Sequence, residues 1–389
     1  MTGGMDWPRT PVDRLQEFKP PFCPRDWCRY HTDPVGFRWY KNGSNKNARG
    51  FRNQRYVCKG CGSSFSRKAF SITYYLKRPE LLRPVAAGLQ AGSAHRQIAR
   101  TQGCAPSTVT RMSARLGRHA MLLHCKSLEA LGKQLEESVV LDHFETFELT
   151  QDLPFGVATV VGSESWFVYG IDPAPHARAG KRSPAQQRRC ERRAPRPTRG
   201  GYLGSTSRTL DRLLALKRPG RELRIVADGM RAYDRAVARH PEGRKIRLEN
   251  HPVPERGPKG TRRSRRAVAR DRAMFPADTL HGLLRHSLAA HKRETIAFGR
   301  RLNAILERLF LTTVWRNFVK HRSERRPDRT TPAMWLGLTD RPWTWTRVLG
   351  RRLFPARERI DPEWMRLYRR AWPTPELPSN TRHRLIFAF

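Results

Sequence analysis

Acidic residues are scarce in this chain relative to its bases. Its 389 residues include 34 Asp plus Glu against 76 Lys plus Arg, which gives a formal net charge of +42 at pH 7. A compact chain with so large an excess of one sign repels itself unless a polyanion neutralises it. Nucleic acid is the expected partner, because each neutralised phosphate releases a counterion. The plain alternative is an Arg-rich protein from a GC-rich genome, but that bias alone usually brings acids with it.

Long apolar runs are also missing. No uninterrupted apolar stretch approaches the roughly 20 residues that span a bilayer, and the N-terminus lacks the apolar core of a signal peptide. We therefore expect a soluble, cytosolic protein with no membrane partner. Cysteines are few as well: there are 7, and four of them form two close pairs near the start. This grouping predicts one metal site in a reducing compartment and argues against a disulfide framework.

The two Cys pairs have the spacing of a zinc site. Four residues separate Cys23 from Cys28, and two separate Cys58 from Cys61, in a segment (YVCKGCGSSFS) whose glycines permit a tight knuckle. Two such knuckles can place four thiolates around Zn²⁺ in a tetrahedron, which leaves no open position and suits a structural ion. We predict a zinc ribbon over residues 21–72. His31 could replace one Cys as a ligand, and buried free thiols are the alternative.

Residues 73–130 have a helical pattern, and GSAHRQIARTQGCAPSTVTRMSARLGRH predicts a helix-turn-helix domain. Ser93 is expected to cap the first helix, Gly103 to make the turn and Pro106 to start the second helix. Val109 and Met112 would then face the core. The side chains left to face the major groove or flanking phosphates are Ser107, Thr108, Thr110, Arg111 and Arg115. An ordinary helical hairpin is the alternative.

The second half of the chain changes to short β-rich segments. SVVLDHFETFEL, FGVATVVG and SWFVYGI predict adjacent antiparallel strands, followed by a helix, the strand ELRIVADG, a second helix and a further strand in RKIRLEN. Basic loops are expected at 176–203 and 255–272, and two long helices between about 277 and 322. This is the order of secondary-structure elements in a ribonuclease-H-like α/β domain, which we place at 135–325.

The expected fold class is therefore multidomain α+β. A zinc ribbon, a helical helix-turn-helix domain and a ribonuclease-H-like domain follow one another, with a helical C-terminal part. Residues 1–20, rich in Pro and charge, predict an N-terminal arm. Residues 326–389 are Trp-rich and are expected to pack as a small cap.

Two Asp residues stand where solvated acids rarely occur. Asp142 lies inside the predicted strand VVLDHFETF, and Asp228 ends the apolar strand RIVADG, directly before a Gly and a helix. A carboxylate at the end of a strand can face an open metal site, and carboxylate oxygens suit Mg²⁺ or Mn²⁺. Pairs of such ions share carboxylates and assist phosphodiester cleavage. A cap or a salt bridge is the alternative role for either residue.

Several blocks make the chain resemble a known family, the DDE transposases of bacterial insertion sequences. LDHFETF is similar to that family's first-acid strand, VADGMRAY to its second-acid block, and HKRETIAFGRRLNAILERLF to its basic and aromatic helix after the third acid. TTPAMWLGLTDRPWTW resembles a tail of related transposases. The order of domains is most similar to the insertion-sequence-one type. The resemblance covers Cys23 to about Arg352.

The family implies a third acid, usually Glu, shortly before the RETIAF block. Counting back from that block reaches Asp278, in MFPADTLHGLLRH, so an Asp stands where Glu is usual. The resemblance thus implies that Asp142, Asp228 and Asp278 hold catalytic Mg²⁺ or Mn²⁺. Asp278 follows Pro276 at an expected helix start, so an N-cap is its alternative role.

Glu294 and Glu307 remain alternatives for the third acid. Basic residues recur after Asp278, and Arg293 and Arg300 among them are expected to contact DNA. A solvated basic face is the ordinary alternative for such a run.

The resemblance implies a transposase that binds the terminal inverted repeats of a mobile element, cuts double-stranded DNA there and joins the freed 3′-OH to target DNA. Handling two ends implies a homodimer or higher oligomer on DNA, in the nucleoid of a bacterial cytoplasm. Two other functions stay open. One is a non-catalytic DNA-binding regulator or an inactive transposase derivative, and the other is a structure-specific nuclease with the same metal core.

Overall fold

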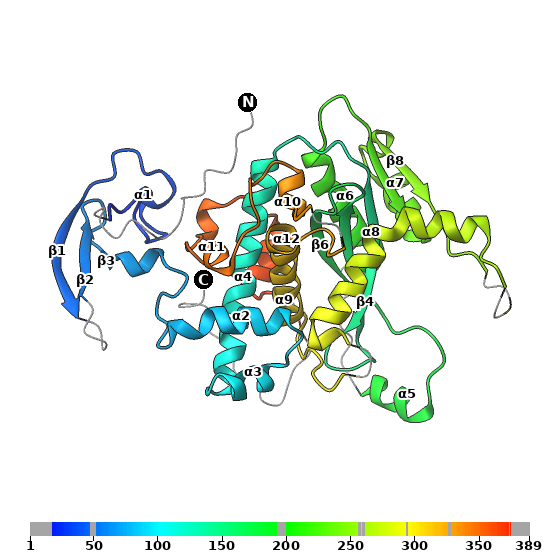
Figure 1. The fold of residues 1–389 in the computed structure, drawn as a ribbon, viewed down its shortest axis with the longest axis horizontal. Helices are drawn as coiled ribbons and strands as arrows, with labels where there is room; N and C mark the ends of the chain where they lie inside the picture. Colours follow the sequence, from blue (N-terminus) through cyan, green and yellow to red (C-terminus); the bar gives the residue numbers. More distant parts are fainter. Residues whose placement is uncertain are drawn as a thin grey trace.

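The computed structural model describes most of the chain: residues 18–46, 52–192, 200–255, 258, 261–292, 295–325, 328–372 and 374. The arm expected at 1–20 lies almost entirely outside these residues, as do Arg293 and Glu294. The fold is mixed α+β, as expected, with one small and one larger sheet. Figure 1 shows the small sheet at one end of the molecule, the long helix α4 in the middle and the larger sheet at the other end.

The small sheet is antiparallel and carries the Cys pairs. It consists of β1 (Trp39–Lys46), β2 (Arg52–Cys58) and β3 (Ser64–Ser66), in that order. A short helix α1 (Arg29–Thr32) and a 3-10 turn η1 (Arg67–Phe70) flank it. Its own small core is aromatic, with Tyr56 and Phe65 stacked 5.9 Å apart.

Four helical segments follow, and local chemistry explains their ends. They are η2 (Pro79–Leu81), α2 (Leu82–Gln90), α3 (His95–Thr101) and α4 (Pro106–Leu131). Gly103 makes the turn before α4 with φ +57°, a conformation that glycine adopts without strain. Pro106 begins α4, as predicted. Ser93 does not cap α3, because Ala94 occupies the N-cap position and its N–H donates to Gln97 Oε1 at 2.7 Å.

The larger sheet has five strands in the order β6-β5-β4-β7-β8. β4 (Val139–Phe147), β5 (Pro154–Gly162) and β6 (Val168–Pro175) form the predicted antiparallel meander. β7 (Leu223–Ala227) and β8 (Ile246–Asn250) pair in parallel, and β7 pairs in parallel with β4. β8 confirms the strand expected in RKIRLEN.

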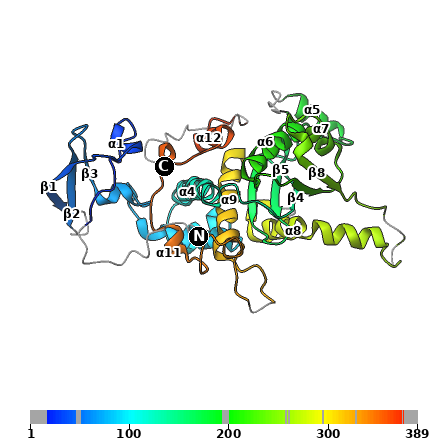
Figure 2. The ribbon, with the colours of Figure 1, turned by 90° about the horizontal axis from the view of Figure 1, so that it is seen from above.

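Helices cover both faces of this sheet (Figure 2). α6 (Gly201–Leu216) and α7 (Arg231–Arg239) lie on one face, and α8 (Arg265–Ser287) crosses the other. A short helix α5 (Pro184–Glu191) lies inside the basic insert 176–203, and a 3-10 turn η3 (Gly243–Lys245) precedes β8. α8 begins twelve residues earlier than predicted, so it includes part of the expected loop 255–272 and carries Pro276 in its interior.

The region after α8 returns to the centre of the molecule. A 3-10 turn η4 (Ala289–His291) leads to α9 (Leu302–Val314), which continues as the π-helical segment η5 (Trp315–Val319). α9 packs along α4, and Gly117 of α4 touches the backbone of Glu307 so closely that a Cβ there would lie 2.4 Å from it. The absence of a side chain at Gly117 is what allows the two helices to approach.

The C-terminal segments pack against this centre. They are α10 (Pro332–Trp335), α11 (Trp345–Val348), η6 (Pro355–Arg357) and α12 (Pro362–Tyr368). Trp343, Trp364 and Trp372 are buried in the same hydrophobic core as α4 and the sheet. The segment also anchors the small sheet, because Arg352 donates from Nη1 to Ala69 O at 2.9 Å and Arg357 donates to His31 O.

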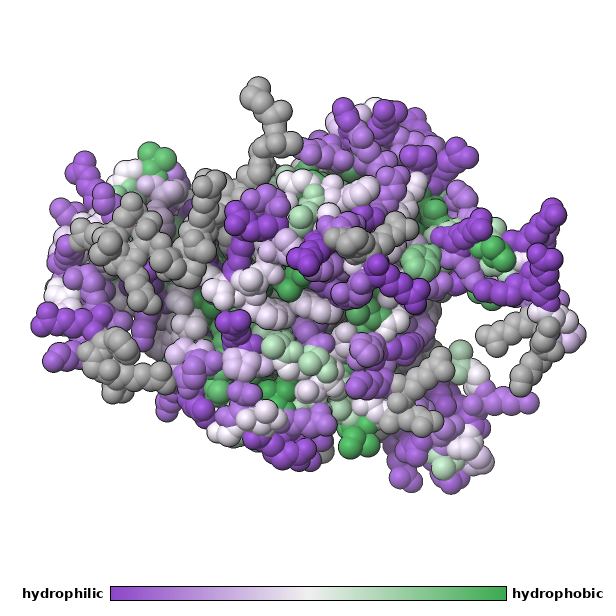
Figure 3. Space-filling model, viewed as in Figure 1, coloured by the Kyte–Doolittle hydropathy of each residue, from purple (hydrophilic) through white to green (hydrophobic). Residues whose placement is uncertain are grey.

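The visible surface is largely polar. Hydrophilic residues cover most of the face in Figure 3, and the hydrophobic patches on it are small and separate. Within the described parts of the chain, no helix combines the length and the apolar character needed to cross a membrane.

Candidate functional site

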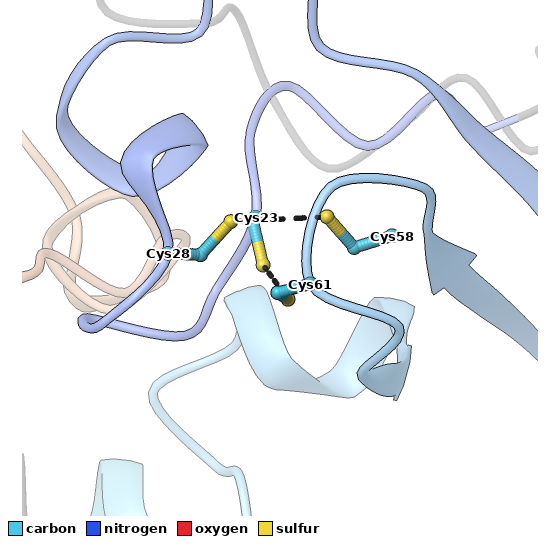
Figure 4. Close-up of side chains that lie close together, drawn as sticks. All are labelled: Cys23, Cys28, Cys58 and Cys61. Carbon is cyan, nitrogen blue, oxygen red and sulfur yellow. Dashed lines mark hydrogen bonds between the residues drawn. The ribbon is translucent and has the colours of Figure 1, made fainter.

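The four predicted zinc ligands come together (Figure 4). The sulfurs of Cys23, Cys28, Cys58 and Cys61 all lie within 4.8 Å of one another. Cys23 Sγ is 3.7 Å from Cys61 Sγ, and Cys28 Sγ is 3.9 Å from Cys58 Sγ. Four sulfurs bound tetrahedrally at about 2.3 Å from Zn²⁺ would be about 3.8 Å apart. The cluster therefore fits a metal ion such as zinc.

His31 is not part of this group. Its Nδ1 lies 2.8 Å from the carbonyl oxygen of Cys23, and its ring packs edge-on against Phe22 and Phe354. Burial lowers the pKa of His31, which favours the neutral ring. His31 supports the knuckle of Cys23 from behind, and the four thiols remain the ligand set.

The sheet brings Asp142 and Asp228 to neighbouring positions. β4 and β7 run parallel, with Val140 paired in register with Val226. Asp142 and Asp228 each follow a member of this pair by two residues, so both carboxylates belong to the same face of the sheet, just beyond the last paired residues of the two strands. Asp142 Oδ1 accepts the backbone N–H of His143 at 2.7 Å, and Asp228 Oδ1 accepts that of Met230 at 3.0 Å.

Helix α8 covers this pair of strands. Met274 and Ala277 pack on Val140 and Val226, which places the next residue, Asp278, beside the two strands. Asp278 lies in the interior of α8 and not at a helix start, so it is not an N-cap. Its carboxylate is turned toward solvent, 42% exposed, and accepts a hydrogen bond from Arg270 Nη1 at 2.6 Å.

The three Asp residues influence one another without closing into a compact site. Among the residues that the structure describes, only the four cysteines form a group of three or more His, Cys, Asp or Glu side chains whose ligand atoms all lie within 4.8 Å of one another. Burial nevertheless raises the pKa of Asp142 to about 7, and the negative charges of Asp228 and Asp278 add to that rise. Three carboxylates that repel one another around a buried position are a chemical setting that a cation relieves.

One residue beside Asp142 escaped the sequence analysis. His281 lies one helical turn beyond Ala277 on α8, with its Nδ1 3.6 Å from Asp142 Oδ2. Its Nε2 lies 2.8 Å from Thr159 Oγ1, which donates to the backbone oxygen of Asp142 at 3.0 Å. Burial lowers the pKa of His281 to about 3, helped by the charge of Arg285. The available signal was the spacing, because His281 follows Ala277 by four positions and shares its helix face.

The opposite face of the sheet carries a second polar cluster. His143 points away from Asp142, since neighbouring strand residues alternate, and its Nδ1 lies 2.9 Å from the hydroxyl of Tyr233 on α7. Tyr202 of α6 packs edge-on against the His143 ring and donates to Glu145 Oε1 at 2.8 Å. The acidic and His side chains of LDHFETF thus lie on both faces of the sheet, with Asp142 on one face and His143 and Glu145 on the other.

The structure places Glu307, one of the other two candidates for the third acid, away from Asp142. Glu307 is buried between α4 and α9, where Arg118 and Arg370 bind it and it lies outside the Asp142 site. Glu294 and Arg293 lie outside the described residues. Arg300 is exposed, in the irregular segment before α9 and not on a helix.

Of the α4 residues predicted to face DNA, only those at the start of the helix are accessible. Ser107, Thr110 and Arg111 are exposed and Thr108 is partly exposed, as a groove-facing surface requires. Arg115 differs from its prediction, because it is buried and donates from Nη1 to the carbonyl oxygens of Ile72 and Tyr74, at 2.8 and 2.6 Å. From Met112 to Cys125 α4 is buried, and these side chains are not available to DNA.

A basic cavity of about 890 Å³ is lined by residues from both the small-sheet region and the C-terminal segment. Its lining contains six cations and no acid: Lys19, Arg67, Lys68, Arg341, Arg347 and Arg351. Phe18, Phe22 and Phe70 supply an aromatic part of the wall. Cations around an aromatic wall suit a polyanion that also carries flat rings, as a nucleic-acid strand does.

Comparison with known proteins does not add a relative. No family model matches this chain, and no curated protein matches its sequence.

Proposed function

We propose that this protein is a DNA transposase that cuts DNA at the ends of a mobile element and joins the freed ends to a target. The observation that carries this proposal is the pair Asp142 and Asp228, on neighbouring parallel strands just beyond their last paired residues, under α8. Two carboxylates so placed are the usual minimum for holding divalent ions at a phosphodiester.

The order of elements supports the same proposal. An antiparallel meander β4-β5-β6 is followed through α6 by β7 and through α7 by β8, both parallel to the first strand of the meander, and α8 closes the unit. This is the order expected of a ribonuclease-H-like domain. Because that fold serves several activities, the carboxylates and not the fold decide the function.

Each residue of the site would have a distinct role in this reaction. Asp142 and Asp228 would hold the divalent ions, and the backbone N–H groups of His143 and Met230 orient the two carboxylates. Bound Mg²⁺ or Mn²⁺ would supply an activated water and neutralise the charge that develops on the phosphate. No Ser or Tyr nucleophile is required, since water and then the DNA 3′-OH attack directly.

The test is a cleavage and strand-transfer assay on DNA that carries the gene's own flanking sequences, with and without a divalent ion. A transposase yields cleaved ends and then joined products, and both disappear with a chelator or in Asp228→Ala. Cleavage without joining would instead indicate a structure-specific nuclease.

A non-catalytic DNA-binding protein is the second candidate. It is favoured by the pairing of Asp278 with Arg270 and by the open spacing of the three carboxylates. Tight binding to the flanking DNA, with no product under any divalent ion, would support it and contradict the transposase.

The cysteine cluster is assigned a structural Zn²⁺. Cys58→Ser removes one of four ligands, so purified protein should lose most of its one equivalent of zinc, and the sheet β1-β2-β3 should become sensitive to protease. Zinc measured by mass spectrometry checks the first result. Cys104→Ser, outside the cluster, should keep its zinc, and full zinc content in Cys58→Ser would contradict the site.

The basic cavity is assigned to the DNA backbone. Binding should weaken steeply between about 50 and 200 mM salt, and the double variant Lys68→Gln/Arg351→Gln should reduce the slope of log K against log salt by about 1–2. Fluorescence anisotropy over a salt series measures both. The matched control is Arg239→Gln/Arg244→Gln, which removes two exposed charges elsewhere. An equal loss in both double variants would show that the cavity has no special role.

A further inference from the structure

The α8 side chain that lies against Asp142 is a histidine and not the expected third carboxylate. His281 Nδ1 lies 3.6 Å from Asp142 Oδ2, and both side chains are mostly buried, with 16% and 15% of their surfaces exposed. Asp278, three residues earlier on α8, is 42% exposed and bound to Arg270. The helix therefore presents an imidazole to the site and a carboxylate to its rim.

Hydrogen bonding assigns the tautomer of this imidazole. The single hydroxyl hydrogen of Thr159 is donated to the backbone oxygen of Asp142, at 3.0 Å. We assign that hydrogen to the carbonyl, so that Thr159 Oγ1 accepts from His281 Nε2, 2.8 Å away, and Nε2 carries the ring hydrogen. Nδ1 is left with a free lone pair directed at Asp142.

Two acceptors thus face each other across 3.6 Å with no hydrogen between them when Asp142 is ionised. Such a pair repels unless a cation lies between the two atoms. Two ligand atoms each about 2.1 Å from one ion are about 3.0–3.4 Å apart, so a small inward movement would let both atoms bind the same ion. The bond from Nε2 to Thr159 is the kind of outer contact that orients a metal-bound His.

We propose that His281, oriented by Thr159, is a metal ligand beside Asp142 and takes the place expected for Asp278. The inference rests on the proposed function, because it concerns the same divalent-ion site. It also changes the expected metal. A nitrogen ligand favours Mn²⁺ or another transition metal over Mg²⁺, since imidazole is a softer donor than carboxylate.

The test measures Mn²⁺ binding to the full-length protein without DNA. Titration calorimetry gives the affinity, and electron spin echo spectroscopy detects nitrogen bound to the ion. The wild type should bind Mn²⁺ with nitrogen modulation from a directly bound imidazole. His281→Phe keeps a ring against Phe144, which lies 5.3 Å from the His281 ring, but removes both nitrogens. It should abolish the modulation and weaken Mn²⁺ binding at least about 10-fold, the lower end of the effect of losing ligand support.

Matched variants separate a ligand role from a folding role. Thr159→Val should also weaken Mn²⁺ binding, by about 10-fold, and Thr159→Ser should restore it, because only the hydroxyl orients the ring. Asp278→Asn should change Mn²⁺ affinity less than 3-fold, as roughly expected of an exposed carboxylate outside the ion's ligand set. Unchanged melting temperatures confirm that the variants fold. If His281→Phe is unstable, the Thr159 pair carries the test.

Three results would overturn the inference: wild-type Mn²⁺ binding without nitrogen modulation, no Mn²⁺ binding that depends on Asp142, or loss of binding in Asp278→Asn with none in His281→Phe. The proposed function fails separately. If the wild type shows the nitrogen modulation but yields no cleaved DNA, His281 remains a metal ligand and the transposase proposal is wrong.

Discussion

Asp142→Asn is expected to stabilise the metal-free protein while removing its ability to bind a divalent ion. Burial, and then repulsion from Asp228 and Asp278, raises the pKa of Asp142 from 3.8 to about 7 in the folded state. Above pH 7 the folded protein must hold a buried, repelled charge that the unfolded chain holds in water. Asparagine has the same shape and no charge, so the variant avoids this cost.

The sign and the pH window follow from linkage. Between about pH 4 and 7 the folded state binds more protons at Asp142 than the unfolded state, so wild-type stability falls as pH rises through this window. At 1.36 kcal/mol for each pKa unit, the gain of Asp142→Asn above pH 7 is at most about 4 kcal/mol, and it vanishes below about pH 4.

Thermal melts of metal-free protein over a pH series measure this gain. Added Mn²⁺ should stabilise the wild type and leave Asp142→Asn unchanged, since ligands stabilise only a state that binds them. Asp278→Asn is the control, because its exposed carboxylate is already paired with Arg270 and should yield no comparable gain. A variant less stable than the wild type at about pH 8 would mean that the Asp142 charge is already compensated.

Glu307→Gln is expected to be the most destabilising single substitution considered for this protein. Glu307 is held by Arg118 at 3.5 Å and by Arg370, whose Nε and Nη2 bind its two oxygens at 2.8 and 2.7 Å. The Arg118 side chain is fully buried, so removing its counter-charge leaves an uncompensated ion in the core. Breaking such a pair costs about 3–5 kcal/mol, which lowers the melting temperature by roughly 5–15 °C for a core of this size.

A double variant distinguishes this cause from a packing defect. Arg118→Met/Glu307→Gln removes the stranded charge and should regain part of the lost stability. Glu129→Gln, whose partner Arg359 is exposed, should change the melting temperature little. The same Glu307→Gln protein, assayed below its melting temperature, should bind Mn²⁺ normally. Loss of Mn²⁺ binding in a folded sample would instead indicate that Glu307 is the third metal-binding acid.

Much of the fold could be predicted because it depends on local chemistry. The Cys knuckles at Cys23 and Cys58, the turn at Gly103 and the start of α4 at Pro106 each follow from a few adjacent residues. Short segments rich in β-branched and aromatic residues likewise predicted the strands of the larger sheet, since strand propensity belongs to the segment itself.

The errors arise where long-range packing overrides the local pattern. Arg115 has the position of a groove-facing residue on α4, but the carbonyl groups of Ile72 and Tyr74 lie beside it in the folded chain and bind it. Pro276 predicted a helix start, yet α8 continues through it because Met274 and Ala277 are held on the sheet. A proline costs a helix about 3 kcal/mol, and buried contacts on both sides can offset that cost.

The sequence by itself determined which residues could do chemistry here: four thiols at knuckle spacing, two Asp at strand positions and an excess of cations for a polyanion. Only the tertiary structure decided which of them meet. Strand register brings Asp142 beside Asp228, the rotation of α8 turns His281 inward and Asp278 outward, and the core encloses Glu307 between two arginines. The reason is physical: residue type and spacing act within a segment, whereas the face a side chain presents depends on which distant segment packs against it.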